Sequence, residues 1–329
     1  MIRARILFVP FVVAFMVLLL LPGESPAQKF NPKGTEPIEF VVQAAAGGGS
    51  DIQARTMQAI IEKEKLSTHP LAVVNRVGGA GAIAFTYVAG KKGDPHVWLT
   101  ATTSFLQTPL LSSKAKYSYK DFTPLGHLAW DDFLIVVRAD SPFKTMKDLV
   151  DAAKKKPGEL KVAGTTAHGG DAIITHQIQK ATGAKFNLIP FKSGGEVMVA
   201  LLGGHVDFAS ANPCEAMAQM EAKKVRVLGA STEKRLAEAP DIPTLKEQGM
   251  NVVYRQFRSI AAPKDIPKEA LRYYQEVLKK MSESKPWKEK YIKENMITWD
   301  YTTSAGTLKV WEFESARFAK IMKEMGTIK

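Results

Sequence analysis

The residues best suited to chemistry lie in three glycine-containing loops, each between an expected strand and an expected helix. These loops span 47–51, 164–171 and 193–195. Glycine lacks a Cβ, so the backbone can approach a ligand closely, and the unpaired N–H groups at a helix start favour an anion. A single loop of this kind is explained equally well as a tight turn. Three loops with the same arrangement, however, predict a ligand site with backbone donors. Their spacing matches neither the G-x-G-x-x-G dinucleotide fingerprint nor a P-loop.

Two polar residues later in the chain are candidates for the same site. Arg258 lies where the chain is expected to cross between two halves, and a guanidinium there can hold a carboxylate with two hydrogen bonds. A structural salt bridge is an equal alternative for Arg258, and Arg255 competes for the ligand. Asn212 precedes Pro213 after an expected strand, where its amide faces the ligand or forms an ordinary turn.

No set of residues predicts catalysis or a metal site. His168 and His176 lack the i, i+4 spacing of a helical zinc pair. Asp131-Asp132 is expected to form a solvated turn, and Cys214, the single cysteine, to be a small buried side chain. Because no nucleophile, base and orienting group occur together, we expect no catalytic residue, no metal and no cofactor.

The elements that position these loops alternate between strand and helix. One series begins with apolar segments of strand length at 38–42, 71–75 and 97–100. A second begins at 133–137 and continues with strands at 160–163, 186–190, 206–209 and 225–228. This alternation indicates βαβ units and a parallel sheet. The mostly helical tail from Pro267 is expected to return to the first half. We therefore expect an α/β fold in which domain 1 comprises 28–132 and 258–329, domain 2 comprises 133–257, and the chain crosses near 130–138 and 252–262.

The first 27 residues have the order of a secretory signal peptide. Two arginines precede an apolar run over 6–21, and helix-breaking Pro22-Gly23 and small residues up to Ala27 follow. The run is shorter than the ~20 residues of a membrane-spanning helix, so we expect cleavage after Ala27. A net charge of +12 raises nucleic acid as a partner. The scattered lysines and the export signal favour instead a solvated basic surface that attracts anions, with no nucleic acid partner.

Taken in order, these motifs resemble the tripartite tricarboxylate transporter substrate-binding proteins, also called the Bug family. The matching blocks cover nearly the whole mature chain and are PIEFVVQAAAGGGSDIQAR (37–55), VVNRVGGAG (73–81), KKGDP (91–95), DFTPLGHLAWDDFLIVVRADSPFKTMKDLV (121–150), LKVAGTTAHGGD (160–171), PFKSGGEVMVALLGGHVDFASANP (190–213) and APDIPTLKEQG (239–249). The resemblance implies a two-domain periplasmic-binding-protein (Venus flytrap) fold, type II-like, in which two crossover strands form the hinge. It also implies an extracytoplasmic receptor that works with the large and small membrane subunits of a transporter.

The resemblance further implies that two facing loops hold a small organic acid through backbone amides, often with ordered waters. The matching positions are Gly48, Gly49, Ser50 and Asp51 on one wall, Thr165, Thr166, His168, Gly169 and Asp171 on the other, and Ser104, Gly194 and Asn212 at the flanks. The chain departs from many members at Gln43-Ala44-Ala45, where they have a proline or an aromatic residue, and at Ile173, where they have a histidine. The first wall is therefore expected to be roomier.

The leading interpretation is a periplasmic, monomeric and non-catalytic receptor. It would capture a small organic carboxylate by charge-assisted hydrogen bonds, close around it and deliver it to a tripartite tricarboxylate-type transporter. Two alternatives stay open. The protein is a ligand-sensing partner of a membrane sensor, or, less favoured, an exported enzyme that acts on a carboxylate.

Overall fold

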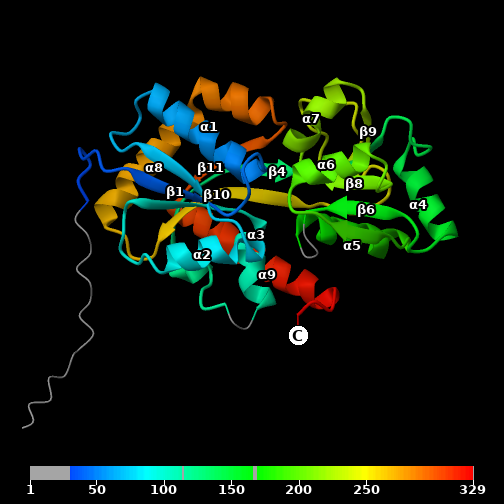
Figure 1. Cartoon of the computed structure of the whole chain (residues 1–329), viewed down its shortest axis with the longest axis horizontal. Coiled ribbons are helices and arrows are strands. Elements are labelled where there is room, and N and C mark those ends of the chain that lie inside the picture. The colour runs from blue at the N-terminus through cyan, green and yellow to red at the C-terminus, as the bar shows by residue number, and fades with distance from the viewer. Residues whose placement is uncertain (1–29, 113–114, 166–168, 329) are drawn as a thin grey trace, which may run out of the picture.

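The computed structural model describes residues 30–112, 115–165 and 169–328 (Figure 1). The expected signal peptide and its cleavage after Ala27 lie outside these residues, as do Thr166 and His168. No helix within the described ranges is long and apolar enough to cross a membrane. Figure 1 shows two groups of strands and helices, with the segments from about residue 135 to 230 in green and yellow-green on the right.

One half is built on a six-stranded mixed sheet with the order β11-β4-β10-β3-β1-β2. Its strands are β1 (Ile38–Val42), β2 (Leu71–Asn75), β3 (Val97–Ala101), β4 (Phe122–Asp132), β10 (Arg255–Pro263) and β11 (Thr298–Thr303). The expected parallel pairing holds for β1 with β2 and β3. It is wrong for the other strands, because β10 runs antiparallel to β3 and β4, and β11 antiparallel to β4.

The other half has a five-stranded sheet with the order β7-β6-β8-β5-β9. Its strands are β5 (Leu134–Arg138), β6 (Lys161–Gly164), β7 (Asn187–Pro190), β8 (Phe208–Ala211) and β9 (Val225–Ala230). β6 pairs in parallel with β7 and β8, whereas β5 is antiparallel to β8 and β9. The second series of strands expected from the sequence is present, in a mixed rather than a parallel sheet.

Two connections join the halves. Phe133 alone separates β4 in the first sheet from β5 in the second, and the chain returns after β9 into β10. The rings of Phe133 and Tyr254, one on each connection, meet edge to face with centroids 5.5 Å apart. β10 begins at Arg255, inside the segment assigned to domain 2, and the exact domain limits stay a prediction.

Helices cover both faces of each sheet. α1 (Gly49–Lys63) and α8 (Lys268–Glu283) share one core with the first sheet, and α6 (Gly194–Leu202) and α7 (Pro213–Glu221) share another with the second. A third core contains residues from both halves and includes α2 (Ala82–Ala89), α3 (Thr103–Leu111), α4 (Met146–Lys155), α5 (Gly170–Thr182) and α9 (Ser304–Glu324). In β5, Ile135 and Val137 face this shared core while Leu134 and Val136 face the opposite one, as the two-residue period of a strand requires.

Candidate ligand-binding site

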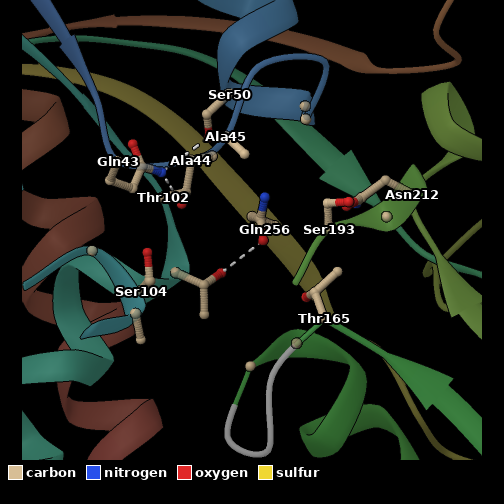
Figure 2. A pocket seen from close by; sticks show the side chains of 18 of the residues that line it. Gln43, Ala44, Ala45, Ser50, Thr102, Ser104, Thr165, Ser193, Asn212 and Gln256 are labelled. Atoms are coloured by element: carbon tan, nitrogen blue, oxygen red, sulfur yellow. Dashed lines mark hydrogen bonds between the residues drawn. The ribbon is translucent and has the colours of Figure 1, made fainter. Parts of the chain in front are cut away.

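A cavity of about 450 Å³ lies between loops of the two halves. Its walls follow the carboxyl ends of β1 and β3 on one side and of β6, β7 and β8 on the other, where ligands bind in open α/β sheets. Figure 2 shows Gln43, Ser50, Thr102 and Ser104 on the first side and Thr165, Ser193 and Asn212 on the second, with Gln256 of β10 between them. Its volume suits a small organic molecule.

Gln43 orients two hydroxyl groups on the first wall. Its Nε2 donates to Ser50 Oγ at 3.0 Å and to Thr102 Oγ1 at 3.2 Å, and its Oε1 accepts from the hydroxyl of Thr100. A hydroxyl that already accepts a hydrogen bond still has its own proton to donate. Because Ser50 and Thr102 both line the cavity, their protons are available to an acceptor on a ligand.

The start of α1 and the side chain of Arg258 form a positively polarised part of the same wall. Gly49 and Ser50 are the first residues of α1, where N–H groups have no acceptor within the helix. Arg258 is 1% exposed, and its Nη1 is buried with no hydrogen-bond partner among the described residues. A Cβ at Gly49 would lie 2.5 Å from Arg258 Nη2, so glycine is what allows the guanidinium to reach the helix start.

Arg258 also forms a buried ion pair with Asp131. Its Nε donates to Asp131 Oδ2 at 2.9 Å, and its Nη2 bonds the same oxygen. Arg255 pairs with the neighbouring Asp132, Nε to Oδ1 at 2.8 Å and Nη2 to Oδ2 at 3.4 Å. The solvated turn expected at Asp131-Asp132 is therefore wrong. Both side chains are 0% exposed, because β4 continues through them and pairs with β10, which brings the two arginines.

The carboxylates of two aspartates accept hydrogen bonds from the glycine loops. Asp171 accepts hydrogen bonds from the Thr165 N–H at 2.6 Å and hydroxyl at 2.7 Å. Burial raises the pKa of Asp171 to about 6, against the opposing effect of those hydrogen bonds. Asp51 accepts from the Gly47 N–H and from Asn75 Nδ2, both at 2.9 Å. Asp51 and Asp171 are absent from the cavity wall because their carboxylates are directed at their own loops.

Most of the expected ligand-contacting residues do lie on the cavity wall. They are Gly48, Gly49, Ser50, Ser104, Thr165, Gly169, Gly194, Asn212 and Arg258. Thr166 and His168 lie outside the described residues. The contact of each residue with a ligand stays a prediction.

Sequence reasoning missed several wall residues. Gln43, Ala44 and Ala45 depart from the pattern of many family members, and all three line the cavity. The position of Thr102, directly after β3, was a usable signal, since the other loops also follow strands. The sequence signal for Glu215 was weaker: it is the third residue of the helix that follows Asn212.

One cluster has the residue types of a metal site, and it lies apart from the cavity wall. Glu36, His69 and His96 each offer a ligand atom, and these atoms lie within 4.8 Å of one another. The two ring nitrogens of His69 already contact the backbone oxygens of Glu36 at 2.8 Å and Asn31 at 2.9 Å. These contacts favour a structural role for His69, which ties the segment before β1 to the start of β2.

Cys214 has no feature of a reactive thiol. It is free and partly buried, in the first turn of α7. Burial, and then the nearby carboxylates of Asp131 and Glu215, raise its pKa well above the ordinary value. The thiol therefore stays protonated, which is unfavourable for a nucleophile.

Comparison with known proteins identifies the family. The sequence model described as tripartite tricarboxylate transporter family receptor matches residues 54–327. The chain belongs to this family. A Cupriavidus necator relative, described as a UPF0065 protein in the gbd 5′ region, is 30% identical over 287 residues, which are 86% of this chain and 85% of that protein. The resemblance drawn from the sequence motifs is thus confirmed.

Solved structures of receptors confirm the fold. A solute-binding protein of this family from Polaromonas is 26% identical, with a TM-score of 0.68 over 88% of this chain and 98% of its own. An R. palustris protein, solved with adipate, is 24% identical, with a TM-score of 0.83 over 89% of this chain and 98% of its own. The two mixed α/β sheets of this receptor therefore form the expected two-domain periplasmic-binding-protein fold.

Proposed function

We propose that this family member is a non-catalytic, monomeric periplasmic receptor. It captures a small organic carboxylate in the cavity between its halves and delivers it to the large and small membrane subunits of a tripartite tricarboxylate-type transporter. The observation that carries the proposal is the arrangement of donors on the first wall, where Gln43 leaves the protons of Ser50 and Thr102 free to donate. The adipate of the R. palustris protein agrees with this ligand class.

The same wall suits an anion in particular. A carboxylate placed at the start of α1 would face the N–H groups of Gly49 and Ser50 and the Ser50 hydroxyl, beside the buried guanidinium of Arg258. Hydrogen bonds to a charged group contribute about 1.5–3 kcal/mol each. An uncharged amide of the same shape lacks the charge that strengthens them, so the wall discriminates between an acid and its amide.

Closure of the halves is the expected response to the ligand. The hinge aromatics lie directly beneath the second wall, since a Cβ at Gly170 would be 2.7 Å from the Phe133 ring and 2.8 Å from the Tyr254 ring. The Tyr254 hydroxyl also donates to Thr103 Oγ1 of the first wall at 3.2 Å. A ligand that contacts both walls therefore lies against residues packed on Phe133 and Tyr254, one on each connection between the halves. Hinge-type closure requires such a link between ligand and hinge.

The test is a thermal-shift screen of the chain without its first 27 residues. The panel contains mono-, di- and tricarboxylates and aromatic acids, each beside its uncharged amide. We expect one class of acid to raise the melting temperature while its amide does not, because a ligand that binds only the folded state stabilises it. The screen is repeated after unfolding and refolding to remove any ligand retained from the expression host. No shift by any acid after refolding would overturn the proposal.

A further inference from the structure

An acidic side chain lies on the wall of a cavity that otherwise suits an anion. Glu215, the third residue of α7, is the one Asp or Glu among the described residues that line it. Its Oε2 accepts from the Asn212 N–H at 3.3 Å, and no described lysine or arginine lies within ion-pair distance of its carboxyl group. The carboxyl group therefore faces the cavity without a counter-ion.

The position of this carboxyl group is fixed by packing against the first residue of α6. A Cβ at Gly194 would lie 1.9 Å from Glu215 Cδ and 2.0 and 2.1 Å from its two carboxyl oxygens. Only glycine leaves this space free, so the backbone of α6 and the carboxyl group of α7 fit against each other. The carboxyl group occupies the space that a Cβ at Gly194 would fill, and this close contact holds the acid at the cavity wall.

The surroundings of Glu215 contain more acids than bases. Asp131 and Asp171 lie close enough to oppose its ionisation, and the one nearby guanidinium, that of Arg258, is already paired with Asp131. Burial and these two carboxylates raise the pKa of Glu215 to about 8. A carboxyl group with this pKa is mostly protonated near pH 7, and a cationic group on a ligand would lower its pKa and favour the charged form.

The two ends of the cavity thus differ in charge preference. The start of α1 and Arg258 suit a carboxylate, whereas the wall at α6 and α7 presents Glu215, which forms no ion pair although Lys192 also lines that wall. We propose that Glu215 is a specificity-determining residue that pairs with a protonated amino group, so that the ligand is an amino-carboxylate rather than a dicarboxylate. This inference rests on the proposed function, because it takes the carboxylate end of the ligand from it.

The experiment is isothermal titration of the refolded receptor with acids of matched carbon number. The six-carbon set is hexanoate, hexanedioate, 2-aminohexanoate and 6-aminohexanoate, and a four-carbon set repeats the comparison. We expect an amino-carboxylate to bind at least about tenfold more tightly than the plain monocarboxylate, the effect of one buried ion pair. Glu215→Gln should abolish this preference and leave the affinity for the monocarboxylate within a few fold.

A matched control lies on the same helix. Glu221 is exposed at the end of α7 and away from the cavity wall, so Glu221→Gln should keep the wild-type preference. Binding of the plain acid with no gain from an amino group, or a preference for hexanedioate, would overturn this inference and leave the proposed function intact. An unchanged preference of Glu215→Gln for the amino-carboxylate would also overturn this inference and leave the proposed function intact. Absence of binding by every acid would overturn both.

Discussion

Arg258 and Asp131 form an ion pair in which both side chains are almost completely buried, at 1% and 0% exposure. The pair joins β10 to β4 beneath the start of α1, where Gly49 leaves room for the guanidinium. Arg258 therefore links β4, which leads out of the first half, to β10, which returns to it, and its guanidinium lies near the same helix start. A ligand carboxylate at this position would bind to a group that the fold has already fixed.

Replacing Arg258 with methionine is expected to reduce the free energy of unfolding by about 3–5 kcal/mol, because Asp131 would be left buried without a counter-ion. Arg255→Met is the matched control. Arg255 is 31% exposed, so water can partly solvate the Asp132 carboxylate after its removal, and we expect a smaller loss. Urea unfolding curves measure both. Equal losses for the two variants would contradict the special role of the fully buried pair.

Gln43→Glu is expected to weaken ligand binding with little change in shape. A carboxylate at this position accepts hydrogen bonds and cannot donate them, so the protons of Ser50 and Thr102 would turn toward it and away from the ligand. We expect the affinity for an organic acid identified by the screen to fall at least about tenfold, also because the new charge repels the acid. Titration calorimetry measures the change. Gln58→Glu, on α1 but outside the cavity wall, serves as the control and should bind normally.

Much of the fold could be predicted because local patterns determine it. The apolar segments at 38–42 and 71–75 are the observed β1 and β2. α4 likewise has a local signal, the capping box between Thr145 and Asp148 at its start. The glycine loops also lie where strand ends meet helix starts, at the cavity wall. These features depend on residues close together in the chain, so their sequence patterns are informative.

The missed features depend on contacts between distant residues. Nothing near Asp131 in the sequence shows that Arg258, 127 positions later, pairs with it, so the aspartates resembled a solvated turn. Gln43 and Thr102 become a single hydrogen-bonded unit only through the pairing of β1 with β3. Glu215 resembled an ordinary residue of the first helical turn until the neighbouring α6 brought Gly194 against it.

Two adjacent glycines provide a sharp test of the contact at Glu215. Gly194→Ala would place a methyl group about where the Glu215 carboxyl group now lies, whereas the nearest atom to a Cβ at Gly195 is Ser193 Oγ at 3.8 Å. We expect Gly194→Ala to destabilise the fold by about 1–3 kcal/mol through overpacking and to change ligand preference by displacing the acid. Gly195→Ala should do neither. Thermal unfolding and titration of both variants measure these effects, and similar behaviour of the pair would contradict the packing described.

The ionisation of Glu215 is expected to make the empty receptor less stable as the pH rises. Burial and the carboxylates of Asp131 and Asp171 raise its pKa from 4.5 to about 8, and Arg258, which also faces it, offsets this only in part. The folded state therefore holds the proton more tightly than the unfolded chain between these two values. Its stabilising contribution is complete below about pH 4.5 and is lost as the pH rises through about 8.

Glu215→Gln isolates this effect, because glutamine does not titrate. Asp171, whose pKa is raised to about 6, lowers stability with pH in the same direction, but it is present in both proteins and largely cancels in their difference. We expect the wild type to lose on the order of 3–4 kcal/mol relative to Glu215→Gln between pH 5 and pH 8.5. Urea unfolding at the two pH values measures the difference. Parallel pH profiles for the two proteins would show that ionised Glu215 is well solvated, and the cavity wall would then lack the charge imbalance described above.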